Sequence, residues 1–214
     1  MQEINKIKSN WKTKKALYTI KKHKNLKKER KDMALPDKAA STEEDYYNLP
    51  ETVRAELIDG KIYYLAAPNR IHQKISSELY TVINQYIKSK HGICEAYYAP
   101  FAVKLWEDRN TIVEPDISVI CTPGKLTDRG CTGAPDWIIE IISPSNPGDD
   151  YVRKLNLYMD AGVREYWIVD PRTKSILVYF LEQSDFQVEK YTFNDKIKTG
   201  IYDDLYIDFT KLGL

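Results

Sequence analysis

Apolar residues recur along this chain with two different periods, and the periods predict where helices and strands lie. Pro68-Asn69 opens a predicted helix that runs to about residue 89, in which apolar side chains fall at every third or fourth position, as in a helix that packs one face against a sheet. A second helical stretch, at about 149–161, has its expected apolar face at Val152, Leu155, Tyr158 and Met159 and ends at Gly162, a residue type that commonly terminates helices. Short apolar runs rich in β-branched and aromatic residues predict strands at 98–105, 112–121, 136–142, 165–170, 175–181 and 186–193.

Local signals ahead of the first long helix predict a short helix and a hairpin. Ser41 stands three residues before Glu44, which is the spacing of a capping box, so we expect a helix to begin there. Asp59-Gly60 separates two apolar runs, and both residue types tolerate the positive φ angles of a two-residue hairpin turn. The run at 136–142 is apolar on both faces, which is typical of a buried central strand. The order of the elements indicates an α/β protein.

Charge divides the chain into two parts. Residues 1–32 hold 12 Lys/Arg and 3 Asp/Glu, whereas the remainder carries a net charge of −8, for +1 overall. We therefore expect a basic, flexible tail over residues 1–40 and a single domain over residues 41–214. Three interpretations of the tail are open: translated sequence ahead of a true start at Met33, an arm that binds a phosphate backbone, or an amphipathic helix that binds a partner.

Cysteine usage and hydropathy predict the compartment. The three cysteines, Cys94, Cys121 and Cys131, include no CxxC spacing. An odd count of this kind argues against a disulfide framework or a zinc knuckle, and we expect Cys121 to be a small core residue. No apolar run approaches the ~18 residues that a membrane span needs, and the N-terminus has no signal-peptide core. These features predict a cytoplasmic protein with reduced thiols.

Two carboxylates stand out because their surroundings are apolar. Asp116 follows Pro115 at the start of an apolar run, and Glu140 lies in the middle of Trp-Ile-Ile-Glu-Ile-Ile. An ionised carboxylate inside such a strand is unfavourable unless a cation or hydrogen-bond donors meet it. If the two strands are neighbours, both carboxylates converge at one end of the sheet, where hard oxygen ligands suit Mg²⁺ or Mn²⁺. The alternative is that Glu140 forms a structural ion pair with a buried Lys or Arg.

Several ordered motifs resemble those of a known nuclease family. They are Glu-Pro-Asp-Ile-Ser (114–118), Ala-Pro-Asp-Trp-Ile-Ile-Glu-Ile-Ile-Ser-Pro-Ser (134–145), Lys154 with Tyr158, and Ala-Gly-Val-Arg-Glu-Tyr-Trp-Ile-Val-Asp-Pro (161–171). Over about residues 45–205 the chain resembles the Uma-type putative restriction endonuclease family, part of the PD-(D/E)XK nuclease superfamily. The resemblance implies a restriction-endonuclease-like core (αβββαβ, with a mixed central sheet) preceded by a β-hairpin.

The resemblance also implies roles for individual residues. Asp116 and Glu140 resemble the metal-binding acids of the superfamily. The position two residues after the second acid, which normally holds a Lys, is Ile142 here, and Lys154 on the following helix fits as its replacement. Glu56 is a candidate third metal ligand, with a simple hairpin charge as the alternative reading.

Basic residues near the starts of the two predicted helices are candidates for contacts with a phosphate backbone. His72 and Arg70 lie at the first helix, and Arg153 precedes Lys154 on the second. A polar surface position is the alternative for His72. The acidic balance of residues 33–214 counts against nucleic-acid binding, because such binders usually present a basic face.

The expected activity is metal-dependent hydrolysis of DNA phosphodiester bonds with Mg²⁺, for which Mn²⁺ would substitute. Lys154 would orient the attacking water and stabilise charge on the phosphoryl group. Two rivals remain: a nuclease-fold binding or regulatory module that no longer cuts, because Ile142 cannot carry charge, and a glycosidase that uses Asp116 with Glu140. DNA is the expected partner, and a homodimer is an option. The chain contains no P-loop, dinucleotide fingerprint or GxSxG elbow.

Overall fold

The computed structural model describes residues 40–143, 148–182 and 187–214. Residues Ser41–Leu214 form one compact unit. Almost all of the predicted basic tail lies outside the described residues. No helix among the described residues is long and apolar enough to cross a membrane.

A mixed six-stranded sheet forms the centre of the unit. Its strands follow the order β12-β11-β10-β9-β6-β3. Their bounds are β3 Glu95–Tyr98, β6 Ile117–Ile120, β9 Trp137–Ile141, β10 Glu165–Asp170, β11 Ser175–Phe180 and β12 Gln187–Thr192. Strands β9 and β10 are parallel and the other neighbours are antiparallel. Strand β9 is buried at every position, which confirms the predicted central strand.

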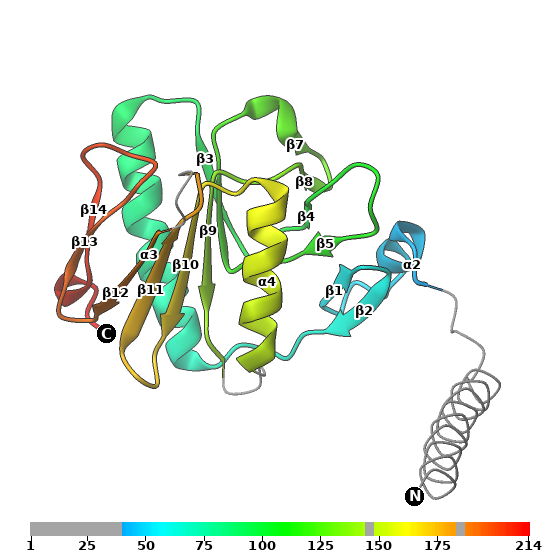
Figure 1. Cartoon of the computed structure of the whole chain (residues 1–214), viewed down its shortest axis with the longest axis horizontal. Coiled ribbons are helices and arrows are strands. Elements are labelled where there is room, and N and C mark those ends of the chain that lie inside the picture. The colour runs from blue at the N-terminus through cyan, green and yellow to red at the C-terminus, as the bar shows by residue number, and fades with distance from the viewer. Residues whose placement is uncertain (1–39, 144–147, 183–186) are drawn as a thin grey trace, which may run out of the picture. The chain divides into compact units, whose positions relative to one another are not determined.

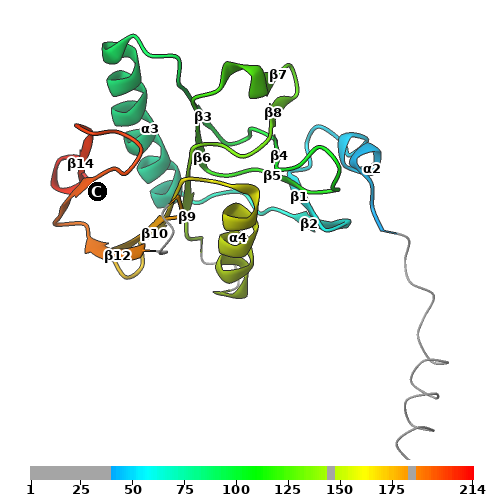
Figure 2. The ribbon, with the colours of Figure 1, turned by 45° about the horizontal axis from the view of Figure 1, so that its top comes forward.

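Two helices cover opposite faces of this sheet (Figures 1 and 2). Helix α3 (Arg70–Lys90) is capped by Asn69, and its predicted apolar stripe packs with Trp137 and Ile139 on one face. Helix α4 (Gly148–Ala161) packs with Ile138 on the other face and ends at Gly162, whose φ is 89°. Because successive side chains of a strand point to opposite faces, Glu140 shares the α4 face with Ile138.

Smaller elements complete the unit. A second sheet has the order β2-β1-β5-β4-β8-β7 and contains the predicted Asp59-Gly60 hairpin, whose turn residues have φ values of 49° and 73°. Its bounds are β1 Ala55–Ile58, β2 Lys61–Tyr64, β4 Val103–Lys104, β5 Ile112–Val113, β7 Leu126–Thr127 and β8 Gly130–Thr132. The other elements are α2 Glu43–Tyr47, η1 Pro123–Lys125, β13 Lys196–Lys198, β14 Tyr206–Asp208 and η2 Phe209–Lys211.

Three expectations about local structure were wrong. The runs at 98–105 and 112–121 each form two strands in different sheets, separated at Pro100 and Pro115. Proline has no N–H to donate to a strand ladder, so the chain leaves one sheet and enters the other there. The capping box of α2 uses Thr42 and Asp45, one residue later than expected.

Helix α4 presents a different face to the sheet from the one its apolar residues predicted. Val152 and Met159 were expected to pack inward, but they are 63% and 43% exposed. Tyr158 is buried as expected, but Tyr151 and Lys154 are buried in place of the other two. The helix is rotated so that Lys154 faces the protein interior.

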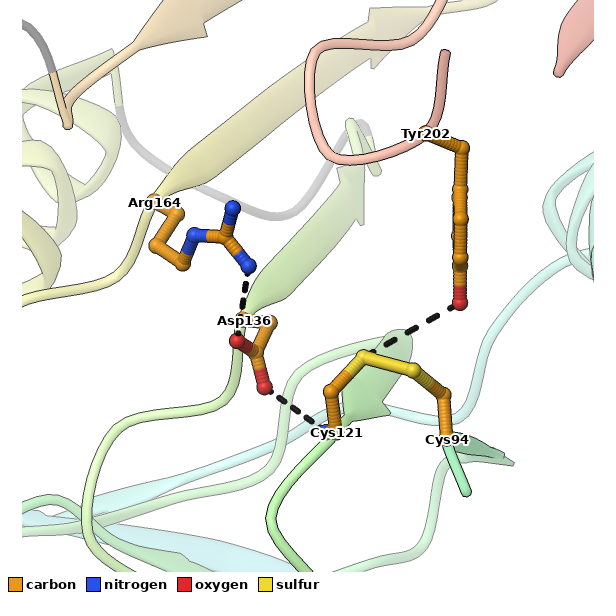
Figure 3. Close-up of a disulfide and its surroundings, with 5 residues drawn as sticks. All are labelled: Cys94, Cys121, Asp136, Arg164 and Tyr202. Atoms are coloured by element: carbon orange, nitrogen blue, oxygen red, sulfur yellow. Dashed lines mark hydrogen bonds and ion pairs between the residues drawn. A yellow bond between two sulfur atoms is a disulfide. The ribbon is translucent and has the colours of Figure 1, made fainter. Parts of the chain in front are cut away.

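The prediction that the cysteines form no disulfide was also wrong. Cys94 and Cys121 are bonded, with Cα atoms 3.9 Å apart, and they sit across from each other just beyond the paired residues Glu95 and Ile120 (Figure 3). The backbone N–H of Cys121 donates to Asp136 at 2.7 Å, and Arg164 pairs with the same carboxylate. The bond therefore ties β3, an edge strand of the central sheet, to β6.

Reducing this disulfide should lower the free energy of unfolding by about 3 kcal/mol, because the unfolded chain regains the entropy of an open loop. The bonded residues are 27 positions apart. Urea unfolding with and without dithiothreitol measures the change. A Cys94→Ser/Cys121→Ser variant is the control. Its free energy of unfolding should not change with dithiothreitol and should equal that of reduced wild type. Identical midpoints for oxidised and reduced wild type would contradict the prediction.

Candidate active site

Asp116 and Glu140 face each other at one end of two neighbouring strands. Strands β6 and β9 are antiparallel, with Ile117 opposite Ile139 and Ser118 opposite Ile138. Extending this register by one residue places Asp116 opposite Glu140. Directly opposed side chains lie on the same face of a sheet, and two like charges in that position destabilise it unless a cation or donors intervene. The neighbouring strands required by the sequence-based metal-site hypothesis are therefore present.

Glu140 is held from helix α4 by two donors. Its Oε1 atom accepts hydrogen bonds from the Lys154 ammonium at 2.9 Å and from the Tyr158 hydroxyl at 2.7 Å. Both donors are buried, and they lie four residues apart, which places them on one face of the helix. This contact explains the rotation of α4, because its polar donors must face the sheet to reach Glu140.

Lys154 also binds a second carboxylate. Its Nζ atom lies 2.8 Å from Oε1 of Glu56 on β1, and that oxygen accepts a further hydrogen bond from the backbone N–H of Glu114 at 3.1 Å. Glu56, Glu140 and Lys154 are all almost fully buried. The ammonium thus joins the hairpin, the central sheet and α4. Lys154 is the buried cation partner that the structural ion-pair interpretation requires, and it lies within the short range of Glu140 that the catalytic interpretation requires.

Asp116 is oriented by helix α3 and by strand β9. Its Oδ2 atom lies 3.0 Å from Nε2 of His72 and accepts a hydrogen bond from the Ile141 backbone N–H at 2.7 Å. The backbone N–H of His72 donates to the side chain of Asn69, the cap of α3, at 2.9 Å. The Nδ1 atom of His72 is buried without a hydrogen-bond partner in the part of the chain that the structure describes. The first turn of α3 therefore fixes the Asp116 carboxylate.

A small polar cavity of about 50 Å³ brings these groups together. Its lining residues are Arg54, Glu56, Leu65, Ala66, Pro68, His72, Glu114, Asp116, Glu140, Ile141, Ser143 and Lys154. Of the predicted site residues, Asp116, Glu140, Lys154, Glu56 and His72 line the cavity. Arg70 and Arg153 do not: Arg70 is exposed, and the Arg153 guanidinium lies over the Tyr63 ring, 4.1 Å from its centroid.

Each of the three central carboxylates uses one oxygen for protein donors and keeps the other available. The engaged atoms are Oδ2 of Asp116 and the Oε1 atoms of Glu140 and Glu56. Their second oxygens accept no hydrogen bond from any described residue. Burial raises the pKa of Glu140 to about 7; Lys154 opposes this shift, whereas the charges of Asp116 and Glu56 add to it.

The donor chemistry of the cavity fits a hard divalent cation. Mg²⁺ prefers carboxylate oxygens and retains several waters, so one or two carboxylates are enough to bind it. A cavity of about 50 Å³ has room for an ion with part of its water shell. Within residues 40–143, 148–182 and 187–214, no three His, Cys, Asp or Glu side chains form a ready metal-binding group.

Comparison with known proteins places this chain in a family. Residues 43–200 match the model of the Uma2 family, described as "Putative restriction endonuclease". The chain belongs to the Uma2 family. The match spans every cavity-lining residue, and it confirms the resemblance recognised from the sequence motifs.

A solved structure and one further protein sequence resemble this Uma2 chain. The crystal structure of "a putative nuclease belonging to DUF820" from Anabaena variabilis ATCC 29413 matches with a TM-score of 0.66 and 25% identity, covering 79% of this chain and 95% of that one. The "Uncharacterized protein slr1290" of Synechocystis sp. (strain ATCC 27184 / PCC 6803 / Kazusa) is 25% identical over 159 residues, which is 72% of this chain and 82% of that protein. The structural match confirms the predicted α/β, nuclease-like fold.

Several residues at or beside the cavity were not anticipated from the sequence. Tyr158 was noted as part of a motif, but its hydrogen bond to Glu140 was not anticipated. Arg54 and Glu114 line the cavity and pair at 3.1 Å, and the Tyr46 hydroxyl donates to Glu114 at 3.2 Å. One signal was available for Arg54: it stands two residues before Glu56, so an extended chain turns both side chains to one side.

Replacing Lys154 with methionine should destabilise the domain by about 3–5 kcal/mol, because it leaves two buried carboxylates without their cation. Lys154 is 3% exposed, so water screens this pair little. Urea unfolding measures the loss. Lys90→Met is the matched control: its pair with Asp204 is exposed and screened by water, so the expected loss is much smaller than for Lys154→Met. Equal losses in the two variants would contradict the prediction.

Proposed function

We propose that this protein is a metal-dependent endonuclease that hydrolyses phosphodiester bonds of DNA. The observation that carries the proposal is the opposition of Asp116 and Glu140 at the ends of β6 and β9, with one oxygen of each left available. Membership in a family described as putative restriction endonucleases and the likeness to a putative nuclease support it. Asp116 and Glu140 would hold Mg²⁺, or Mn²⁺ in its place, and Glu56 lies close enough to contribute to the charge of the site.

The protein's own contribution is to fix the carboxylates and exclude excess water. Mg²⁺, when bound, would activate a water molecule and polarise a phosphoryl oxygen. Lys154 and Tyr158 fix Glu140 from one side, while His72 and the Ile141 N–H fix Asp116. Ligands held in this way lose little conformational entropy when a cation binds, which favours binding. Lys154 would act as the buried positive charge next to the reacting phosphate.

The engagement of Lys154 supports one alternative. An ammonium that already pairs with Glu56 and Glu140 at 2.8 and 2.9 Å has a structural role, whatever it does in catalysis. With Ile142 buried at the position where the superfamily usually keeps its lysine, a nuclease fold that binds DNA without cutting it is the second candidate. The two candidates differ in whether DNA is cleaved when metal is present.

Wild-type protein should nick supercoiled plasmid DNA in Mg²⁺ or Mn²⁺ and lose this activity in EDTA. Asp116→Asn should reduce nicking by at least about a hundredfold, since one metal-binding carboxylate and its charge are removed. Gel electrophoresis of the plasmid over time measures the rate. Asp203→Asn, on an exposed carboxylate outside the cavity, is the control and should match wild type.

Metal binding can be followed without any cleavage. Millimolar Mn²⁺ should raise the melting temperature of wild type through preferential binding to the folded state, and it should have no effect on Asp116→Asn. A melting temperature that ignores Mn²⁺ in wild type would overturn the metal site. Metal binding without nicking of any DNA would favour the binding module over the endonuclease.

A further inference from the structure

Two cationic side chains line the carboxylate cavity, and the structure gives them different tasks. Lys154 is 3% exposed and lies between Glu56 and Glu140. Arg54 lies just before β1, and its side chain is 29% exposed. Lys154 is therefore committed to the interior, whereas Arg54 is open to a molecule that arrives from solvent.

The guanidinium of Arg54 is anchored at one position only. Its Nε atom donates to Oε2 of Glu114 at 3.1 Å. In the part of the chain that the structure describes, its two terminal nitrogens donate no hydrogen bond. A guanidinium presents donors along more than one edge, and the edge formed by the terminal nitrogens matches two oxygens of a phosphate. The anchored Nε leaves that edge available.

Glu114 is itself held in place, so the anchor is rigid. Its other oxygen, Oε1, accepts a hydrogen bond from the hydroxyl of Tyr46 on α2 at 3.2 Å. Its backbone N–H donates to Glu56, and it stands two residues before Asp116. The position of Arg54 is thus tied to the same strand end that carries Asp116. An arginine held in this way gives up little rotamer freedom when it binds a ligand.

The net negative charge of the cavity favours a cationic hydrogen-bond donor at its entrance. Four carboxylates and two cations line the cavity, a formal charge of −2 when His72 is neutral. A divalent cation would cancel that charge, but an approaching phosphodiester still needs a positively charged contact at the entrance, because the domain as a whole is acidic. The exposed arginine beside the cavity meets that need, whereas the buried lysine does not.

We propose that Arg54 is a substrate-binding residue. Its terminal guanidinium nitrogens would donate hydrogen bonds to the non-bridging oxygens of a DNA backbone phosphate beside the carboxylate cavity. This inference rests on the proposed endonuclease function and names the residue that holds the scissile phosphate or its neighbour. Glu114 acts as a positioning residue: it fixes the guanidinium and competes with the phosphate for its charge.

Duplex DNA binding tests the proposal directly. Fluorescence anisotropy with a labelled duplex in Ca²⁺, across a range of salt concentrations, separates binding from cleavage. Arg54→Ala should weaken binding about tenfold or more, as expected for a charged hydrogen-bonded contact, and should lower the slope of log K against log salt by about 0.9. Arg54→Lys should keep the salt slope but lose part of the affinity. Equal affinity and slope for Arg54→Ala and wild type would overturn the proposal.

Two further variants separate phosphate binding from a purely structural role. Arg164→Ala removes an arginine of similar exposure that pairs with Asp136 at the opposite end of β9, and its DNA binding should equal that of wild type. Glu114→Gln preserves shape but removes the competing charge, so it should bind DNA more tightly than wild type. If Arg54→Ala weakens binding but keeps the wild-type salt slope, Arg54 serves only to hold Glu114 in place and the proposal fails. If Arg54→Ala does not fold, Arg54→Lys and Glu114→Gln decide the question.

The outcomes also distinguish this inference from the endonuclease proposal. Nicking by wild type with unchanged kcat/KM in Arg54→Ala would sustain the nuclease and overturn the role of Arg54. DNA binding that depends on Arg54, in a protein that never nicks, would sustain the phosphate contact and overturn the nuclease. A wild-type protein that binds no DNA in Ca²⁺ would overturn the phosphate contact.

Discussion

A single buried ammonium organises this domain. Lys154 lies between Glu56 and Glu140, so it joins the N-terminal hairpin to the central sheet through helix α4. Burying three charges is unfavourable unless each meets its partners, and replacing such groups with apolar ones often leaves a protein equally stable. The arrangement is therefore better explained by what it positions than by stability. It sets the rotation of α4, brings Tyr158 to Glu140, and leaves Val152 and Met159 exposed.

Proline interruptions place the acidic residues where they can act. Pro115 divides an apolar run that would otherwise continue through the sheet, and the chain changes sheets there. Asp116 consequently lies at the end of β6, where its side chain lines the cavity rather than packing in the core. Glu114 lines the same cavity. The N-terminus of α3 reaches this strand end through His72. The site residues therefore lie at strand ends, and the packed core holds those ends in fixed positions.

Local signals in the sequence predicted the elements whose structure depends on neighbours in the chain. The Asp59-Gly60 hairpin, helix α3 and the fully buried strand β9 belong to this group, and the choice of Asp116 and Glu140 followed from the cost of burying charge. Contacts between distant segments were not predictable. Cys94 and Cys121 face each other only once β3 pairs with β6, and the inward face of α4 depends on carboxylates from two other elements. Arg54 looked ordinary because an exposed arginine needs no explanation until its neighbours are known.

The structural and catalytic interpretations of Glu140 do not exclude each other, because a carboxylate has two oxygens. Oε1 of Glu140 accepts hydrogen bonds from Lys154 and Tyr158, and these bonds fix the orientation of Oε2. The same division holds for Asp116, whose Oδ2 is engaged by His72 and Ile141. A lysine two residues after Glu140 on β9 is consequently not required for a positive charge at this strand end. Lys154 on helix α4 supplies that charge instead, so Ile142 is compatible with an active site. Whether the protein is an enzyme or a binding module therefore depends on whether the available carboxylate oxygens bind a metal and whether Arg54 binds phosphate.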